Sequence, residues 1–357
     1  MMTFFFKKYF LLFFLCLGIS GCLKDDVSPV AEISLSDNAL LLHALEQDGD
    51  YGNSAALPSV VDVDEVANNL GAYLLLDLRT VQEYADGHIS GAVHLRSDSL
   101  LTFLNSVNSG SYAKIVLISS DGQASSYFTS LLRLYGIPNA YSLLFGMSQW
   151  NAFFSHSWTD NIADNIQVTR NFTFSNYSSE QLFPLPEIAL PNSGAEMKTK
   201  IKMRIADLIH AGFADGGAFV KIYPPDTMMF NGEAAADFYI VCYGDRSLHA
   251  QNSFDPVSVG HFPRSVSFLP GKDFKSTENL QLLPNRQKIV IYSYSGQESA
   301  FITAYLRVLG YDAKSLSFGA HNLFYSFLSA KKSAYSPFVF LTSNIRNYNY
   351  VTGMSAP

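Results

Sequence analysis

The feature that most restricts the fold of this chain is an internal duplication. Residues 114–123, KIVLISSDGQ, match residues 288–297, KIVIYSYSGQ, and residues 131–136, LLRLYG, match residues 305–310, YLRVLG. The units of a solenoid are much shorter than this spacing, so the pattern indicates two diverged tandem domains. The chain has 357 residues, of which 48% are hydrophobic and 15% charged, so it can bury two cores.

Both halves alternate short apolar runs, typical of buried parallel strands, with amphipathic stretches that end at glycine. The expected strands are 73–78, 92–95, 114–118 and 140–144 in the first half, and 238–243, 265–269, 288–292 and 313–318 in the second. The expected helices are 37–47 with Ser36 as N-cap, 63–70, 123–135, 148–154, 198–213, 297–309 and 321–328. This rhythm predicts an α/β fold in which each domain has a central parallel sheet flanked by helices.

The same pattern sets the expected boundaries along the chain. Residues 22–58 form a tether and an N-terminal helix, 59–155 the first domain and 196–335 the second. Residues 156–195 are rich in Asn, Ser, Thr and Pro without a clear period, so we expect a connector. Residues 336–357 are expected to form a C-terminal tail.

The N-terminus predicts export from the cytoplasm. Two lysines precede an apolar run at 9–19, which is too short to span a bilayer and is typical of a signal peptide, here 1–21. The run ends in Ile19-Ser20-Gly21-Cys22, which resembles a bacterial lipobox and implies a lipid anchor on Cys22. An ordinary signal peptide followed by a chance cysteine is the alternative. Residues 23–26, LKDD, resemble a tag that sends some lipoproteins of Gram-negative bacteria to the cell surface.

We therefore expect the protein at the cell envelope, anchored by lipid to the outer membrane on its periplasmic or surface face. Removing residues 1–21 leaves 22 basic against 31 acidic residues, a net charge of −9. This balance argues against nucleic acid as a partner. Of three cysteines, Cys16 leaves with the signal and Cys22 is acylated, so only Cys242 keeps a thiol. We expect no disulfide, no zinc site and no cofactor.

The first half carries an ordered series of motifs: LDLR at 76–79, EY at 83–84 and GHISGA at 87–92. The series resembles the signature of rhodanese-like domains over about residues 60–150. The second half keeps GHFP at 260–263, with Cys242 at the position of Asp77 and Gly244 at that of Arg79. The resemblance implies two tandem rhodanese-like domains. We interpret Asp77, Arg79, His88 and His261 as structural residues that order turns, although either histidine is also a candidate base.

In active members of the family, a loop between a strand and a helix carries a cysteine that forms a persulfide, inside a cradle of backbone N–H groups that binds the anionic donor. Serine holds this position twice in the present chain. The first loop is Ser119, Ser120, Asp121, Gly122, Gln123, Ala124 and Ser125; the second is Ser293, Tyr294, Ser295, Gly296, Gln297, Glu298 and Ser299. A hydroxyl forms no persulfide, and acidic residues in these loops disfavour an anion, so the resemblance implies an inactive homologue.

Three functions stay open at this point. The first is a non-catalytic binding or scaffolding module whose two loops keep a site for a small anion or a protein. The second is a residual enzyme: a sulfurtransferase through Cys242, or a hydrolase or phosphatase at Ser119 or Ser293. No Gly-x-Ser-x-Gly elbow supports the hydrolase, and Cys242 is expected to be buried on a core strand. The third is a purely structural role in a surface complex.

Overall fold

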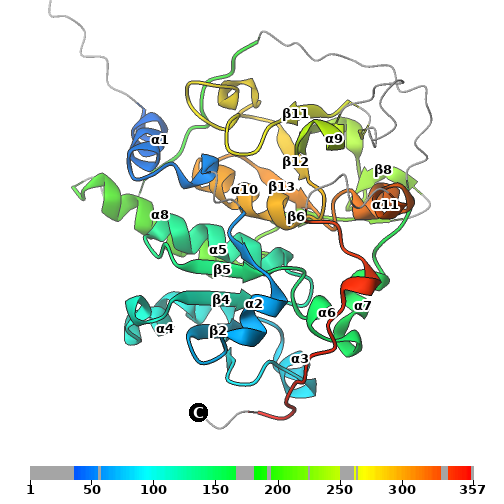
Figure 1. Cartoon of the computed structure of the whole chain (residues 1–357). Helices are drawn as coiled ribbons and strands as arrows, with labels where there is room; N and C mark the ends of the chain where they lie inside the picture. The colour runs from blue at the N-terminus through cyan, green and yellow to red at the C-terminus, as the bar shows by residue number, and fades with distance from the viewer. Residues whose placement is uncertain are drawn as a thin grey trace, which may run out of the picture. The chain divides into compact units, whose positions relative to one another are not determined.

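The computed structural model describes residues 36–54, 58–165, 181–190, 194–223, 226–249, 261–262, 264–330 and 337–354 (Figure 1). The predicted signal peptide, Cys22 and the motif at 23–26 lie outside these ranges. The described residues belong to one compact unit, residues 35–357. Within the described ranges, no helix combines the length and the apolar character needed to cross a membrane.

The first half contains a five-stranded parallel sheet in the order β1-β5-β4-β2-β3. Its strands are β1 (Val60–Val61), β2 (Tyr73–Asp77), β3 (Val93–His94), β4 (Lys114–Ile118) and β5 (Ala140–Leu143). Its helices are α2 (Val63–Asn68), α3 (Val81–Asp86), α4 (Leu100–Ser106), α5 (Gln123–Tyr135), α6 (Met147–Trp150) and α7 (His156–Thr159). Apolar side chains fill both faces of the sheet, as the continuous apolar runs of its inner strands require.

The second half contains a second five-stranded parallel sheet, in the order β11-β10-β12-β13-β6. Its strands are β6 (Phe219–Val220), β10 (Phe238–Tyr243), β11 (Val266–Phe268), β12 (Lys288–Tyr292) and β13 (Ala313–Leu316). Its helices are α8 (Met197–Ala211), α9 (Arg246–His249), α10 (Gln297–Val308) and α11 (His321–Ala330); α1 (Asp37–Gln47) precedes both sheets. Read from β6, this sheet has the strand order of the first.

The predicted fold class is confirmed: the chain is α/β, with parallel sheets flanked by helices. Ser36 caps α1 as expected, its hydroxyl accepting a hydrogen bond from Ala39 N. The helix expected at 148–154 is interrupted, because Asn151 is extended and its side chain caps a new 3₁₀ turn, Ala152–Phe154. A small antiparallel sheet, which we did not predict, follows β6 and consists of β7 (Ile222–Tyr223), β8 (Asp226–Phe230) and β9 (Glu233–Ala234).

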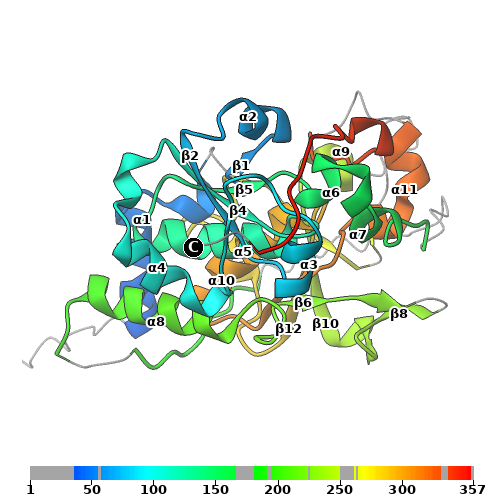
Figure 2. The ribbon, with the colours of Figure 1, turned by 90° about the horizontal axis from the view of Figure 1, so that it is seen from below.

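Helices α5 and α10 pack against each other and join the halves, as Figures 1 and 2 both show. They are the helices that follow the two serine loops, so both loops lie at the junction between the halves. Most residues of both helices are buried. Helices that carry apolar residues nearly all round belong inside a protein, which explains why each lies between a sheet and its counterpart.

The described parts of the expected connector do not form a free linker. Residues 160–165 run from the first half onto α11 of the second, where Ala163 N donates to His321 O at 2.9 Å and Ala163 O accepts from Tyr325 N at 3.2 Å. Residues 166–180 lie outside the described ranges. The first half therefore extends a strap over the second.

The C-terminal residues 337–354 make the reverse connection. They run back to α6 and α3 of the first half (Figure 1), where Arg346 N donates to Gln149 O at 3.0 Å and Tyr348 N to Trp150 O at 2.9 Å. Val351 pairs with His88 in an antiparallel bridge. The tail is thus part of the packed structure, and each half carries a strap over the other.

Candidate functional site

The candidate site consists of the two serine loops, 119–125 and 293–299, at the ends of β4 and β12. Each loop turns into its helix at a glycine in the left-handed region: φ is +88° at Gly122 and +84° at Gly296. A side chain at either position would also collide with a glutamine of the other loop. Glycine is therefore required here both by the backbone conformation and by the close approach of the two loops.

In the first loop, the hydroxyl of Ser119 occupies the cradle of backbone N–H groups. Its oxygen accepts hydrogen bonds from Gly122 N at 3.0 Å and Ser125 N at 3.4 Å. Behind it, the hydroxyls of Ser125 and Ser142 lie 2.7 Å apart. Ser119 is 6% exposed. The backbone N–H groups that could bind an anion are therefore already hydrogen-bonded to the Ser119 side chain.

The second loop repeats this arrangement. The oxygen of Ser293 accepts from Gly296 N and from Ser299 N, each at 3.1 Å, and the hydroxyls of Ser299 and Ser315 lie 2.8 Å apart. Ser293 is fully buried. The hydroxyls of Ser119 and Ser293 therefore have the same inward role in the two halves.

Acidic side chains occupy further donors of both loops. The Asp121 carboxylate accepts from Gln123 N and Gln123 Nε2, both at 2.9 Å. The Glu298 carboxylate accepts from Ser295 N at 3.2 Å, from the Ser295 hydroxyl, and from the Ser293 hydroxyl at 3.1 Å. Burial raises the pKa of both carboxyl groups. Each loop thus holds a carboxyl group of its own where an anion would compete for the same donors.

Two glutamines lock the loops together. Gln297 Oε1 accepts from Phe145 N, and Gln123 Oε1 accepts from Phe318 N, each at 2.8 Å. Gln297 Nε2 also donates to Gly122 O at 3.1 Å. Both glutamines are almost fully buried. The amide groups therefore close the space between the halves at the position where the loops face each other.

Three other loop residues contact parts of the protein outside the two loops. Ser120 donates its hydroxyl hydrogen to Glu83 Oε1 at 2.7 Å, and Ala124 packs against the core. Tyr294 donates its hydroxyl hydrogen to Asp245 Oδ1 at 2.8 Å. All three side chains thus contact other residues of the protein.

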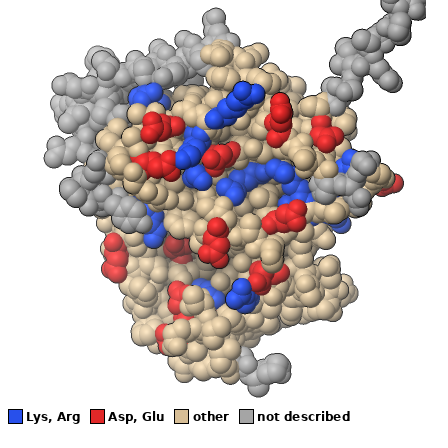
Figure 3. Space-filling view, turned by 180° about the vertical axis from the view of Figure 1, so that it is seen from behind, with Lys and Arg blue, Asp and Glu red and all other residues tan. Residues whose placement is uncertain are grey.

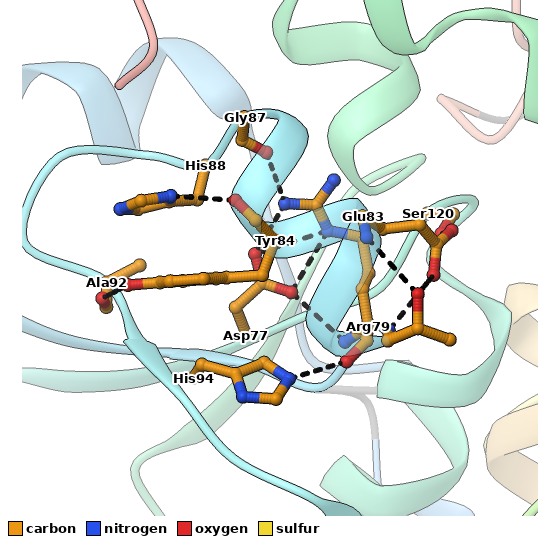
Figure 4. A network of polar contacts seen from close by, with 10 residues as sticks. Asp77, Arg79, Glu83, Tyr84, Gly87, His88, Ala92, His94 and Ser120 are labelled. Atoms are coloured by element: carbon orange, nitrogen blue, oxygen red, sulfur yellow. Dashed lines mark hydrogen bonds and ion pairs between the residues drawn. The ribbon is translucent and has the colours of Figure 1, made fainter. Parts of the chain in front are cut away.

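Asp77 and Arg79 form a buried ion pair beside the first loop (Figure 4). Arg79 Nη2 lies 2.7 Å from Asp77 Oδ2 and donates to Gly87 O at 2.7 Å. The pair therefore ties the end of β2 to the Gly-His turn. In the second half, Cys242 pairs with Tyr292 in register as Asp77 pairs with Ile118, so Cys242 occupies the place of Asp77, as the sequence predicts.

The two candidate histidine bases lie in turns. His88 Nδ1 donates to Tyr84 O at 2.9 Å, and its ring stacks on Tyr84 with centroids 3.7 Å apart (Figure 4). His261 is 7% exposed, next to Phe262, whose N–H donates to Tyr292 Oη at 3.1 Å. The contacts of His88 fit a role in ordering its turn.

The Cys242 thiol is fully buried on β10. Burial raises its pKa to about 12. The thiolate is the nucleophile in sulfur chemistry, so this cysteine is in its unreactive form at neutral pH. Among the described residues, no group of three or more His, Cys, Asp or Glu side chains could hold a metal ion.

Three features of this site were not predicted: the roles of the two glutamines and of Glu298, which the sequence placed only within the loops, and the contribution of Trp158. The reciprocal roles of Gln123 and Gln297 were signalled only by the repeated Gly-Gln pair. The sequence predicts only that Glu298 disfavours an anion, whereas its carboxylate folds inward onto Ser293 and Ser295. The third is Trp158 of α7, whose Nε1 donates to Asp121 O at 3.0 Å; no repeat or motif marks it.

The match to a family model lies in the first half. A model of the rhodanese-like domain matches residues 62–153. Thiosulfate sulfurtransferase GlpE of Pseudomonas entomophila is 32% identical over 79 residues, which are 22% of this chain and 71% of that protein. The chain belongs to the rhodanese-like family. The putative sulfur carrier protein YrkF of Bacillus subtilis is 25% identical over 125 residues, 32% of this chain and 63% of that protein.

The similarity to solved structures of the rhodanese type is remote over the whole chain. A thiosulfate sulfurtransferase from Pseudomonas aeruginosa aligns with 81% of this chain and 47% of its own, at 14% identity and a TM-score of 0.26. The chain thus spans less than two thirds of the length of this enzyme and of the Bacillus subtilis protein.

Proposed function

We propose that this protein is a non-catalytic binding or scaffolding module built from two degenerate rhodanese-like domains. The observation that carries the proposal is the state of the loops: their N–H donors are bound to Ser119, Asp121, Ser293 and Glu298 of the chain itself. A substrate anion would have to displace these groups and break the lock between the glutamines. The matching strand orders support a second rhodanese-like domain.

The proposal places the mature chain at the cell envelope, anchored by lipid on Cys22. The sequence 19–22 supports the anchor. Replacing Cys22→Ala in the native host is expected to move the protein from the membrane fraction to the soluble fraction and to abolish labelling with a fatty acid analogue. A wild type that takes up no label, or labelling that Cys22→Ala leaves unchanged, would overturn lipid anchoring on Cys22.

The charge distribution supports a partner other than nucleic acid. On the face shown in Figure 3, Lys and Arg side chains lie among Asp and Glu side chains. Such a mixed surface produces no extended positive field to attract a polyanion. Crosslinking of the lipidated protein in whole cells, followed by mass spectrometry, tests the scaffolding role: one recurrent protein supports it, and its absence in repeated experiments favours binding of a small ligand.

A hydrolase at the loops is the second candidate, because the Ser293 hydroxyl donates to Glu298 Oε2 at 3.1 Å. A carboxylate beside a serine can act as a base. Both side chains are buried, however, which denies substrate access. Hydrolysis of p-nitrophenyl acetate or phosphate that is lost in Ser293→Ala or Ser119→Ala would establish this candidate instead. The proposal expects equal background rates for the wild type and both variants.

A further inference from the structure

A separate cavity of about 260 Å³ lies beside the serine loops, where residues 160–165, β7 and the start of α11 come together. Figures 1 and 2 both show α7, which precedes these residues, near α11. The lining residues are Asp160, Asn161, Ala163, Asn165, Lys221, Ile222, Ser317, Phe318 and Asn322. Small-molecule pockets occupy about 300–1,000 Å³, so this cavity suits a ligand smaller than most cofactors.

The cavity contains one cationic group, the ammonium of Lys221. Lys221 forms no ion pair with any residue in the described ranges. Its charge acts on the carboxyl group of Asp121 in the first loop, where it opposes the effect of burial. Asp160, which also lines the cavity, is exposed and accepts from the Thr159 hydroxyl, and the Lys221 ammonium lies 5.7 Å from the centre of the Phe219 ring. An ammonium outside any ion pair can pair with an anionic group in the cavity.

Polar groups without partners lie in the same lining. Ser317 is 5% exposed, and its hydroxyl has no partner among the described residues, although its backbone N–H bonds to Val220 O. Asn322 accepts from Asn165 through its side-chain and backbone oxygens, which leaves the two N–H donors of Asn322 Nδ2 unused within the described chain. Asn322 is half-buried, and a polar group that the chain leaves unpaired is available to bond to a ligand or to water.

Apolar walls complete the cavity. Phe318 and Ile222 are both about 5% exposed and both line it. Phe318 is held in place because its N–H donates to Gln123 Oε1 at 2.8 Å. An apolar wall opposite hydroxyl and amide groups suits a compact ligand whose carbon skeleton packs on one side and whose hydroxyl groups face the other.

We infer that this cavity binds a small hydroxylated carboxylate of the uronic acid class. The carboxylate pairs with Lys221, and the ligand's hydroxyl groups bond to Ser317 and Asn322. This inference rests on the proposed binding function and gives that function a ligand class. It places the ligand next to the serine loops, whose own donors are already occupied.

Isothermal titration of the purified soluble chain with D-glucuronate tests the inference. D-glucose lacks the charge and acetate lacks the hydroxyl groups, so each is expected to bind at least about tenfold more weakly than glucuronate. Lys221→Met is expected to weaken glucuronate binding at least about tenfold, and Ser317→Ala to weaken it severalfold. The control Lys272→Met changes an exposed lysine elsewhere in the second half and is expected to leave binding unchanged.

Absence of glucuronate binding by the wild type overturns the inference, and so does binding that Lys221→Met leaves unchanged while its unfolding midpoint equals that of the wild type. Failure of the proposed non-catalytic function has a different signature, namely turnover in a sulfurtransferase or hydrolase assay. A wild type that binds no glucuronate and shows no turnover refutes the cavity assignment alone.

Discussion

The lock between the two loops can be tested with Gln297→Ala. The substitution removes the acceptor of Phe145 N, a buried donor, and the group that donates to Gly122 O. An orphaned buried donor costs about 1–3 kcal/mol, and the truncated side chain leaves a cavity between the halves. We therefore expect the free energy of unfolding to fall by about 2–4 kcal/mol, measured by urea denaturation followed by circular dichroism.

The chain supplies a mirror variant and a matched control. Gln123→Ala orphans Phe318 N in the same way and is expected to cost a similar amount. Gln82→Ala removes an amide that bonds only to exposed Asp86 and should change stability by less than about 0.5 kcal/mol. If both buried variants behaved like Gln82→Ala, the reciprocal lock would be refuted.

Three further substitutions test other parts of the structure. His321 Nδ1 donates to Tyr294 O and Nε2 accepts from Phe340 N, and burial lowers its pKa from 6.5 to about 4. The contribution of His321 to stability is therefore complete above pH 6.5 and falls by about 3 kcal/mol in total as the pH drops towards 4. In His321→Asn the free energy of unfolding should lose this pH dependence. An unchanged pH dependence would contradict the assignment. Gly146 has φ +58°, and an added Cβ would lie 2.1 Å from Ser119 O. Gly146→Ala should therefore lower the free energy of unfolding by about 3 kcal/mol or more, whereas Gly136→Ala, where the added Cβ meets open space, should lower it by about 1–2 kcal/mol. Equal losses of unfolding free energy in urea denaturation would argue against the close approach at Gly146. Asp77→Asn leaves the buried Arg79 charge without its counter-ion and should lower the free energy of unfolding by about 3–5 kcal/mol, and the thermal midpoint with it. Asp98→Asn, in an exposed ion pair, should leave the thermal midpoint unchanged. Similar midpoints for the two variants would count against a structural role for Asp77.

Local sequence was enough to predict the regular elements. The bounds of 114–118, 123–135, 238–243 and 288–292 agree with the structure, because each is a continuous apolar or amphipathic run that ends at polar residues or glycine. The order of the strands within each sheet was not predicted, because it depends on pairing between segments far apart in the chain. The antiparallel sheet of β7, β8 and β9 was not predicted, because β7 and β9 have two residues each and Met228 of β8 is exposed.

The site was predictable only in part, because its contacts join residues far apart in the chain. The loops and their serines follow from the repeated motif. The contact between Gln297 and Phe145 spans 152 positions and depends on how the halves pack. The Glu298 side chain points inward because the start of its helix is buried. Its carboxylate therefore bonds to Ser295 and Ser293 instead of to water. The cavity around Lys221 is likewise assembled from segments that no motif connects.

The central claim is that the filled loops transfer no sulfur. A thiosulfate:cyanide sulfurtransferase assay on the purified chain, with an active rhodanese as positive control, tests it most directly. We expect no thiocyanate above the protein-free rate for the wild type and for Cys242→Ala, because serine forms no persulfide and the Cys242 thiol stays protonated. Sustained thiocyanate formation by the wild type that Cys242→Ala abolishes would contradict the account.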